Sequence, residues 1–288
     1  MVSFGAIKYV KMEILKSSEA LISWRNQWSS ASIGFVPTMG ALHLGHLSLM
    51  SKSKQDNDKT LTSIFVNPTQ FNDPKDFLHY PNTIEADIKK LHDLGVDAVF
   101  IPEVKDMYPE VRVEHFHVPI LTESLEAKMR PGHFDGVITI IRKLFDLAQA
   151  TRVYLGEKDF QQLSIISSWV KKENRAETIV ACPTHREPSG LAMSSRNQRL
   201  TANQLEQATL LYQILNTVKE NKYNNSPVEW EIWARSRFAE TPYFRLDYFE
   251  IIDAETFGPV ADWSDAEQAI AVVAAFLGEV RLIDNMRL

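Results

Sequence analysis

Short apolar runs alternate with amphipathic stretches along the first 182 positions of the chain. The apolar runs are four to six residues long, as in buried strands, and occupy positions 33–36, 61–66, 96–101, 152–155 and 178–181. Between these runs, apolar side chains recur at helical spacings, which predicts helices over 18–28 and 84–94 and others beginning near 44, 137 and 160. Strands that are apolar throughout and alternate with helices predict a parallel sheet covered by helices on both faces.

The alternation stops after Cys182. The rest of the pattern predicts a helix over 200–222, a half-buried strand over 245–252, and a hairpin of 269–276 with 280–283 around Gly278. A polar stretch separates the helix from the strand. The change of pattern therefore predicts a second, smaller unit of mixed structure.

Together the patterns predict an α/β fold of two domains. Residues 1–182 form a Rossmann-like, doubly wound parallel sheet, and residues 183–288 form a smaller C-terminal α+β domain that acts as a lid over the ligand site. Residues 111–118 contain a short β-like piece. Pro37 is expected to end its strand, because proline cannot continue a central ladder.

Two histidines follow the first sheet strand, in a turn bracketed by glycines. Gly40 and Gly45 permit a tight turn or a close approach to a ligand. His43 and His46 lie three positions apart at the start of a helix, where unpaired N–H groups attract an anion, so a phosphate chain is the expected ligand. The spacing imitates a P-loop without its Lys-Ser/Thr pair, and two surface histidines or half of a metal site are alternatives.

Polar residues also follow the other predicted strands, at 67–70, at 156–159 and from 184 onward. Parallel sheets bind ligands beyond the carboxyl ends of their strands, near the point where strand order reverses, so these loops predict one shared site. Lys158 can neutralise charge that builds on phosphorus, and Asp159 can hold a ribose hydroxyl, the lysine or magnesium. A surface ion pair is the alternative for these two neighbours.

A second phosphate-binding candidate lies near position 195. Ser194 and Ser195 offer two hydroxyls and Arg196 a fixed positive charge, although a capping serine or a solvated loop would look the same. The amides of Gln70 and Gln162 suit the hydroxyls and carboxylate of a small polar substrate, or are ordinary surface glutamines. Two further candidates for pyrophosphate, which are also compatible with a solvated turn, are Arg130 and His133.

Charge and cysteine content narrow the class of partner. The 288-residue chain carries a net charge of -6, which gives no basic footprint for nucleic acid or an anionic membrane. Cys182 is the only cysteine, so an intrachain disulfide is impossible and a reducing compartment fits. Residues 1–17 lack a secretory pattern, and the longest apolar run, 269–278, is about half the ~20 residues that span a bilayer. We expect a cytoplasmic protein with small-molecule substrates.

Five motifs, in order along the chain, resemble the pantothenate synthetase (pantoate–beta-alanine ligase) family, and the segment 277–285 resembles that family's C-terminus. The motifs are Pro-Thr-Met-Gly-Ala-Leu-His-Leu-Gly-His at 37–46, Phe-Val-Asn-Pro-Thr-Gln-Phe at 65–71, Arg-Pro-Gly-His-Phe at 130–134, Gly-Glu-Lys-Asp-Phe-Gln-Gln at 156–162 and Met-Ser-Ser-Arg-Asn at 193–197. Residues 221–243 show no such resemblance.

The resemblance implies a magnesium-dependent homodimer of the class-I aminoacyl-tRNA-synthetase-like nucleotidyltransferase superfamily. Such an enzyme condenses pantoate with beta-alanine, using ATP and a pantoyl-adenylate intermediate, to give pantothenate, AMP and pyrophosphate. The competing hypotheses are a nucleotidylyltransferase that moves AMP onto a phosphate acceptor and a non-catalytic nucleotide sensor. The first would release no free AMP, and the second needs no second substrate pocket.

By motif match, the resemblance also assigns residues to the site. His46 corresponds to the general acid, and His43, Lys158, Ser194, Ser195 and Arg196 would surround the phosphates. Gln70 would contact pantoate and beta-alanine, Gln162 would contact pantoate, and Asn67, Arg130 and His133 would also bind substrate; Asp159 is the candidate magnesium ligand. The residues that would contact ATP are Pro37, Thr38, Met39, Gly40, Ala41, Leu42, His43, Leu44, Gly45, His46, Gly156, Glu157, Lys158, Asp159, His185, Met193, Ser194, Ser195 and Arg196.

Overall fold

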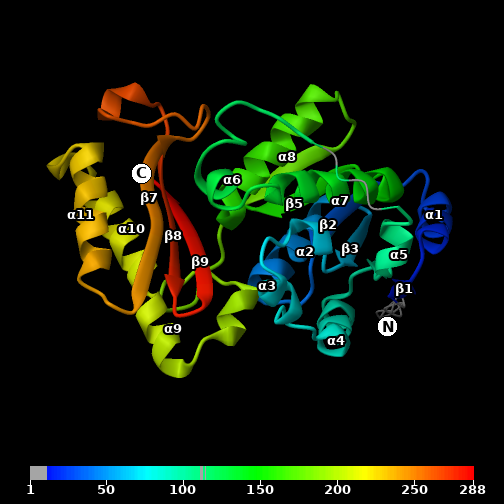
Figure 1. Ribbon diagram of the computed structural model, residues 1–288. Coiled ribbons are helices and arrows are strands. Elements are labelled where there is room, and N and C mark those ends of the chain that lie inside the picture. The colour runs from blue at the N-terminus through cyan, green and yellow to red at the C-terminus, as the bar shows by residue number, and fades with distance from the viewer. Residues whose placement is uncertain (1–11, 111–112, 114) are drawn as a thin grey trace, which may run out of the picture.

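The computed structural model describes residues 12–110, 113 and 115–288. Its larger sheet has six parallel strands in the order β1-β4-β3-β2-β5-β6. The strands span Glu13–Leu15 (β1), Ile33–Thr38 (β2), Lys59–Ile64 (β3), Ala98–Phe100 (β4), Arg152–Gly156 (β5) and Thr178–Cys182 (β6). Strand order reverses between β2 and β5, because the chain moves outward through β3 to β4 before it returns (Figure 1).

Helices cover both faces of this sheet. α2 and α4 lie on one face, where Met50 and Leu91 share a buried cluster with Val36. α1, α7 and α8 lie on the other, where the ring of Phe145 packs edge-on against Phe35. The helices of this part span Ser18–Gln27 (α1), Leu44–Asp56 (α2), Pro74–Leu78 (α3), Ile84–Leu94 (α4), Val104–Met107 (α5), Leu125–Met129 (α6), His133–Ala148 (α7) and Phe160–Lys172 (α8). The predicted doubly wound α/β fold is confirmed.

The C-terminal part contains a three-stranded antiparallel sheet in the order β7-β8-β9 (Figure 1). One of its faces carries α10 and α11, with Leu215 and Trp230 packed against Phe249. The other face contributes to the core of the larger sheet, where the ring of Phe257 stacks on Phe160 at 5.3 Å between centroids. The elements span Ala202–Ala208 (α9), Leu210–Glu220 (α10), Pro227–Ala239 (α11), Phe244–Asp253 (β7), Ala269–Leu277 (β8) and Val280–Arg287 (β9).

One expectation about the strands was wrong, and one strand was not predicted. Pro37 lies inside β2, opposite Ser63 of β3. The backbone nitrogen of Pro37 points toward the β5 side of β2. β5 pairs with β2 only at Gly34 and Phe35, so no β5 residue lies opposite Pro37. The missing N–H therefore removes no ladder bond. β1 was not predicted, because a three-residue edge strand carries too little pattern.

The predicted helix over 200–222 is two helices, α9 and α10. The Thr209 hydroxyl between them donates to the Glu206 carbonyl at 2.7 Å, a local bond of the kind that bends helices. α11 was not predicted at all, although Ser226 and Glu229 form a capping box at its start. That box was the available sequence signal.

α7 begins earlier than expected, at His133, directly after a left-handed Gly132. Gly136 therefore lies within the helix, where a Cβ would stand 2.3 Å from the Thr69 carbonyl oxygen, so close packing rather than a loop explains this glycine. The β-like piece at 111–118 lies partly outside the described residues, and 113 and 115–118 are in no strand. Most of the segment considered for a secretory leader also lies outside the described residues.

Candidate active site

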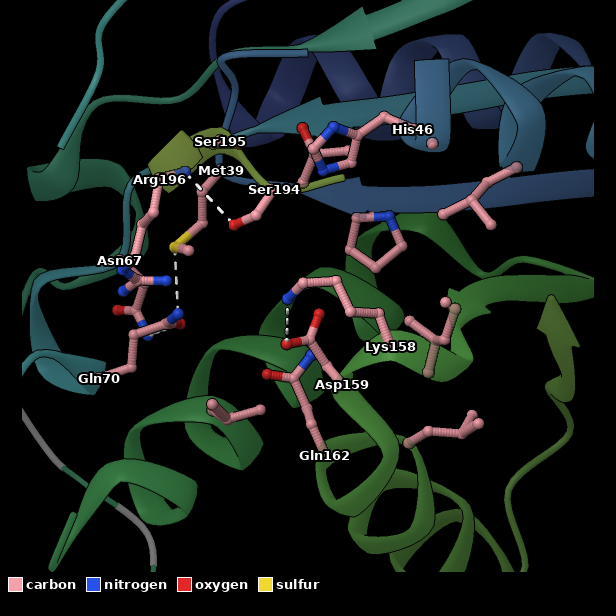
Figure 2. Close-up of a pocket in the computed structure, with 18 of the residues that line it drawn as sticks. Met39, His46, Asn67, Gln70, Lys158, Asp159, Gln162, Ser194, Ser195 and Arg196 are labelled. Atoms are coloured by element: carbon pink, nitrogen blue, oxygen red, sulfur yellow. Dashed lines mark hydrogen bonds and ion pairs between the residues drawn. The ribbon is translucent and has the colours of Figure 1, made fainter. Parts of the chain in front are cut away.

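A cavity of about 220 Å³ opens where β2 and β5 end, at the reversal of strand order (Figure 2). It is lined by nineteen of the predicted site residues: Pro37, Thr38, Met39, His43, Gly45, His46, Asn67, Gln70, Arg130, His133, Gly156, Lys158, Asp159, Gln162, His185, Met193, Ser194, Ser195 and Arg196. Five others do not line it: Gly40, Ala41, Leu42, Leu44 and Glu157.

A buried carboxylate holds the histidine turn from behind. Asp87 of α4 is fully buried and accepts the N–H groups of Ala41 and Leu42, each at 2.8 Å. Gly40 and Ala41 both have positive φ, which bends the main chain toward this carboxylate. Ala41 and Leu42 thus support the turn from inside the core, and the side chain of Leu44 faces solvent. Sequence reasoning missed Asp87, which lies 45 positions beyond Leu42 on an amphipathic helix.

The two histidines are neutral, and one hydrogen bond defines the tautomer of His46. The His43 backbone N–H donates to Nδ1 of His46 at 3.3 Å, so the proton of His46 is on Nε2. Burial, with the nearby His43 and Lys158, holds the pKa of His46 well below its usual value. Burial likewise lowers the pKa of His43 to about 4, with help from Lys158. Near neutral pH, His46 is therefore a neutral N–H donor.

Lys158 and Asp159 extend from the turn after β5, and Figure 2 shows them between His46 and Gln162. Their Nζ and Oδ1 atoms are 3.3 Å apart, and the side chains are 17% and 48% exposed. The lysine is thus held in the cavity rather than solvated at the surface. Figure 2 places Gln162 below this pair and Ser194 across the cavity from it.

Gln70 is held with its amide N–H₂ turned toward Met39. Asn67 is buried, and its Nδ2 donates to Oε1 of Gln70 at 3.0 Å. The Tyr108 hydroxyl donates to Oδ1 of Asn67 at 2.6 Å. Among the described residues, the Nε2 of Gln70 donates only to the Met39 sulfur, at 3.0 Å. Sulfur is a weak acceptor, so this amide can donate to a better one. Asn67 is therefore a positioning residue for Gln70.

Arg130 and His133 fix the main chain of Gln70. Because an arginine only donates, Nε2 of His133 must accept from Arg130 at 3.1 Å, and its Nδ1 must donate to the Gln70 carbonyl at 2.7 Å. Burial, together with the neighbouring Arg130 guanidinium, lowers the pKa of His133 to about 3. His133 is therefore a neutral structural link.

The serine-arginine loop is tied to the rest of the site by two contacts. Ser195 is buried and its hydroxyl donates to the Ala41 carbonyl at 3.1 Å, which joins this loop to the histidine turn. Arg196 and Arg199 each pair with Asp76 of α3 at 2.7 Å. The two guanidinium groups hold the pKa of Asp76 below its usual value, against the opposing effect of burial. Asp76 was another residue that sequence reasoning missed.

The described residues contain no group of three or more His, Cys, Asp or Glu side chains that could hold a metal ion. Within the described part, the alternative in which His43 and His46 are half of a metal site therefore has no third ligand. Asp159 is the one acidic side chain of the cavity lining. A single carboxylate fits Mg²⁺, which keeps several waters and binds through one or two carboxylates plus substrate phosphates.

The family model for pantoate-beta-alanine ligase matches residues 13–287. The chain belongs to the pantoate-beta-alanine ligase family. It is 44% identical to a pantothenate synthetase of Bacteroides thetaiotaomicron over 88% of this chain and 90% of that protein. It is 42% identical to the pantothenate synthetase of Azobacteroides pseudotrichonymphae over 96% of this chain and 99% of that protein.

Solved pantoate-beta-alanine ligase structures also share the fold. A Thermus thermophilus pantothenate synthetase superposes with a TM-score of 0.90, at 37% identity, over 96% of this chain and 99% of that one. A Francisella tularensis pantoate-beta-alanine ligase, described as complexed with beta-gamma ATP and beta-alanine, has a TM-score of 0.80 at 38% identity over 96% and 97%. The chain is thus an ATP-dependent ligase, and the nucleotidylyltransferase and sensor alternatives are not favoured. Within the described residues, no helix is both long and apolar enough to cross a membrane.

The neutral histidines of this ligase predict a pH dependence of stability. The unfolded chain protonates His133 near pH 6.5, the folded chain only near 3, so between these values the unfolded state binds more protons. This contribution to the free energy of unfolding is complete above pH 6.5 and is lost as the pH falls. His133→Gln can keep both hydrogen bonds without titrating. The free energy of unfolding, measured with urea at pH values from 6.5 to 4.5, should therefore depend less steeply on pH in this variant than in wild type. The exposed His92→Gln should keep the wild-type slope.

Asp87 carries a second prediction for this site. Asp87→Asn turns an N–H₂ group toward one of the two backbone N–H groups it now accepts, leaving a buried donor unpaired. We expect a loss of about 1–3 kcal/mol in the free energy of unfolding, together with a lower kcat. Urea titration and turnover measure both, with the exposed Glu85→Gln on the same helix as the control. Unchanged stability would contradict the role assigned to Asp87.

Proposed function

We propose that this chain adenylates pantoate with ATP in the cavity between β2 and β5 and then transfers the pantoyl group to beta-alanine. One observation carries this proposal: a single cavity has phosphate-binding groups, His46 and Lys158, beside the neutral amides of Gln70 and Gln162 (Figure 2). A triphosphate and a small polar acid can thus lie side by side. The description of the Francisella complex, with an ATP compound and beta-alanine, supports the same pairing.

The reaction needs no covalent nucleophile from the protein. A carboxylate oxygen of pantoate attacks the α-phosphorus of ATP, and the bond to pyrophosphate breaks. The amine of beta-alanine then attacks the carbonyl carbon of the acyl adenylate, AMP leaves with the bonding electron pair, and the nitrogen loses a proton. Positioning and charge stabilisation are therefore the protein's main contributions.

Four groups are proposed to donate to the phosphates: His46, Lys158, Ser194 and Arg196. Because the pKa of His46 lies well below its usual value, we assign it a neutral Nε2–H that donates where charge develops, rather than an imidazolium acid. His43 is proposed to contact the nucleotide through the part of its ring that lines the cavity, because its Nδ1 is buried against the start of α2. The Ser195 hydroxyl already binds the Ala41 carbonyl, so its proposed role is to hold the loop.

The remaining assignments follow the cavity lining. We propose that Gln70 binds both pantoate and beta-alanine and that Gln162 binds pantoate. Asn67, Arg130 and His133 support Gln70 from behind. Of the residues predicted to contact ATP, we propose that those lining the cavity do so. His185 would adjoin the nucleotide through its main chain. Five predicted residues are proposed only to shape the turns and not to contact ATP: Gly40, Ala41, Leu42, Leu44 and Glu157.

Magnesium is proposed to arrive with ATP, with Asp159 as its protein ligand. When bound, Mg²⁺ would neutralise phosphate charge. Asp159 fits this role because it is half-exposed, lines the cavity and already holds Lys158 nearby. A titration of ATP binding with Mg²⁺, in wild type and Asp159→Asn, tests the assignment.

A cytoplasmic homodimer with two domains is also proposed. β6 is an edge strand with half-buried Ile179 and Val180, and an unpaired strand edge is a template for another chain. Sedimentation would distinguish the 32.9 kDa monomer from its dimer. The division at 182/183 is supported by the end of β6 at Cys182 and by the separate apolar cluster beyond it. The single cysteine is compatible with the cytoplasm.

One omission assay tests the proposed function. The enzyme is incubated with ATP, pantoate and beta-alanine, and AMP and pyrophosphate are followed with each substrate left out in turn. Pyrophosphate should appear with ATP and pantoate alone, whereas sustained AMP release should require beta-alanine. Pyrophosphate formation independent of pantoate would contradict the proposal.

A further inference from the structure

Two adjacent residues of β9 each contact a different loop of the active site. β9 is the edge strand of the smaller sheet, so one of its sides faces away from β8. Asp284 and Asn285 lie in this strand and are 3% and 8% exposed. Burying an amide and a carboxylate is costly unless both are well bonded, and here both are.

Asn285 holds the turn that carries Lys158. Its Nδ2 donates to the carbonyl oxygens of Glu157 and Lys158, both at 2.9 Å. Because both partners can only accept, the amide nitrogen and not the oxygen must face them. One side chain thus fixes two successive peptide groups at the base of Lys158.

Asp284 holds the loop that leads to Ser194. Its carboxylate pairs with both Nη atoms of Arg186, at 2.6 and 3.0 Å. Arg186 in turn donates to the Gly190 carbonyl at 3.1 Å and, through a backbone bridge, pairs with Ala192. The bidentate ion pair therefore fixes the base of the loop just before Ser194.

The two contacts are also joined to each other. The Asn285 backbone N–H donates to Oδ1 of Asp284 at 2.8 Å, and its carbonyl accepts from Arg186 at 3.1 Å. Neither Asp284 nor Asn285 lines the catalytic cavity. Asp284 lines an adjoining cavity that shares Lys158, Ser194 and Arg196 with the catalytic one, and both residues hold the loops that carry those groups.

We propose that Asp284 and Asn285 are positioning residues that set the separation of Lys158 from the Ser194–Arg196 loop. The inference rests on the proposed function, in which these two loops grip opposite parts of one triphosphate. Lys158 and Arg186, one in each loop, are 28 positions apart in the sequence. The side chains of β9 contact both loops and hold them together. Misplacement of a catalytic group by about 1 Å can cost about a hundredfold in rate, so such a connection has a measurable effect.

The test uses Asn285→Asp and Asn285→Ala in the full-length enzyme. Asn285→Asp keeps the size of the side chain but places carboxylate oxygens against two carbonyls, so the turn must move; Asn285→Ala only releases it. We expect kcat to fall about tenfold to thirtyfold in Asn285→Asp and less in Asn285→Ala. KM for pantoate should change less than twofold, because Gln70 and Gln162 are untouched. The control is Glu267→Gln, an exposed position just before β8 of the same sheet.

The adenylation half-reaction separates positioning from mere stability. Pyrophosphate released in a single turnover with ATP and pantoate alone should slow in Asn285→Asp as much as kcat does, at temperatures well below its thermal midpoint. Wild-type kcat in Asn285→Asp, with or without a lowered thermal midpoint, would overturn the inference while leaving the proposed function intact. Failure of the wild-type enzyme to release pyrophosphate would instead overturn the proposed function, and this inference with it.

Asp284→Asn provides a second variant. It keeps the shape but leaves the Arg186 guanidinium without its charged partner, and it should slow the same half-reaction. If this variant does not fold, Asn285→Ala still decides, because Asn285 carries no charge and its truncation leaves none unpaired. A normal half-reaction in folded Asp284→Asn would remove Asp284 from the proposal.

Discussion

Replacement of His46 by alanine is expected to lower kcat by about a hundredfold or more while the protein still folds. His46 presents a neutral Nε2–H to the cavity, because its Nδ1 already accepts the His43 backbone N–H. Loss of one such donor from a pre-organised site typically costs ~3 kcal/mol of transition-state stabilisation. Loss of the bond to His43 costs stability on the scale of a helix cap, about 1 kcal/mol. Steady-state turnover and thermal unfolding measure the two effects separately.

The pH profile refines this prediction. The pKa of His46 lies well below its usual value, so the ring should stay neutral and kcat should show no decline attributable to it as the pH falls from 7 to 6. His92→Ala, an exposed histidine on α4, is the matched control and should keep wild-type turnover. Turnover of His46→Ala within threefold of wild type would contradict the assignment, as would a kcat that requires protonated His46.

The sheet could be predicted from sequence because its signal is repeated. Apolar strands alternate with amphipathic helices through the first 182 residues, so errors at single boundaries do not change the fold class. Elements without repetition were missed. β1 is three residues long, and the break between α9 and α10 depends on one Thr209 side chain bond. The start of α11 was marked by Ser226 and Glu229, but no apolar periodicity drew attention to it.

The cavity lining could be predicted because loops at the carboxyl ends of parallel strands meet at one edge of the sheet. The residues that hold those loops could not. Asp87, Asp76 and Asn285 lie 45 to 128 positions from the groups they contact. Asp87 and Asp76 have no motif around them, and the resemblance of segment 277–285 did not indicate what Asn285 contacts. Only the fold brings these oxygens and this amide to the loops. Sequence therefore indicates the residues that face the ligand better than it indicates the residues that hold their loops in place.

Replacement of Lys158 by alanine is the second variant expected to lose about a hundredfold or more in kcat. The Lys158 side chain is 17% exposed and projects into the cavity below His46 (Figure 2). Its ion-pair partner, Asp159, is half-exposed, and exposed ion pairs contribute little to stability. Folding should therefore be unaffected, and the loss should appear where negative charge moves between the α-phosphate and pyrophosphate.

Lys158→Arg discriminates charge from geometry at the same position. Arginine keeps the positive charge but replaces a compact ammonium with a planar fork, so it should restore only part of the lost rate if the position of the charge matters. Single-turnover release of pyrophosphate from ATP and pantoate is the measurement, because it isolates the step in which Lys158 is assigned a role. Lys171→Ala, an exposed lysine on α8, should match wild type. If Lys158→Ala releases pyrophosphate at the wild-type rate but slows only the transfer to beta-alanine, Lys158 acts on the acyl adenylate and not on the phosphates of ATP.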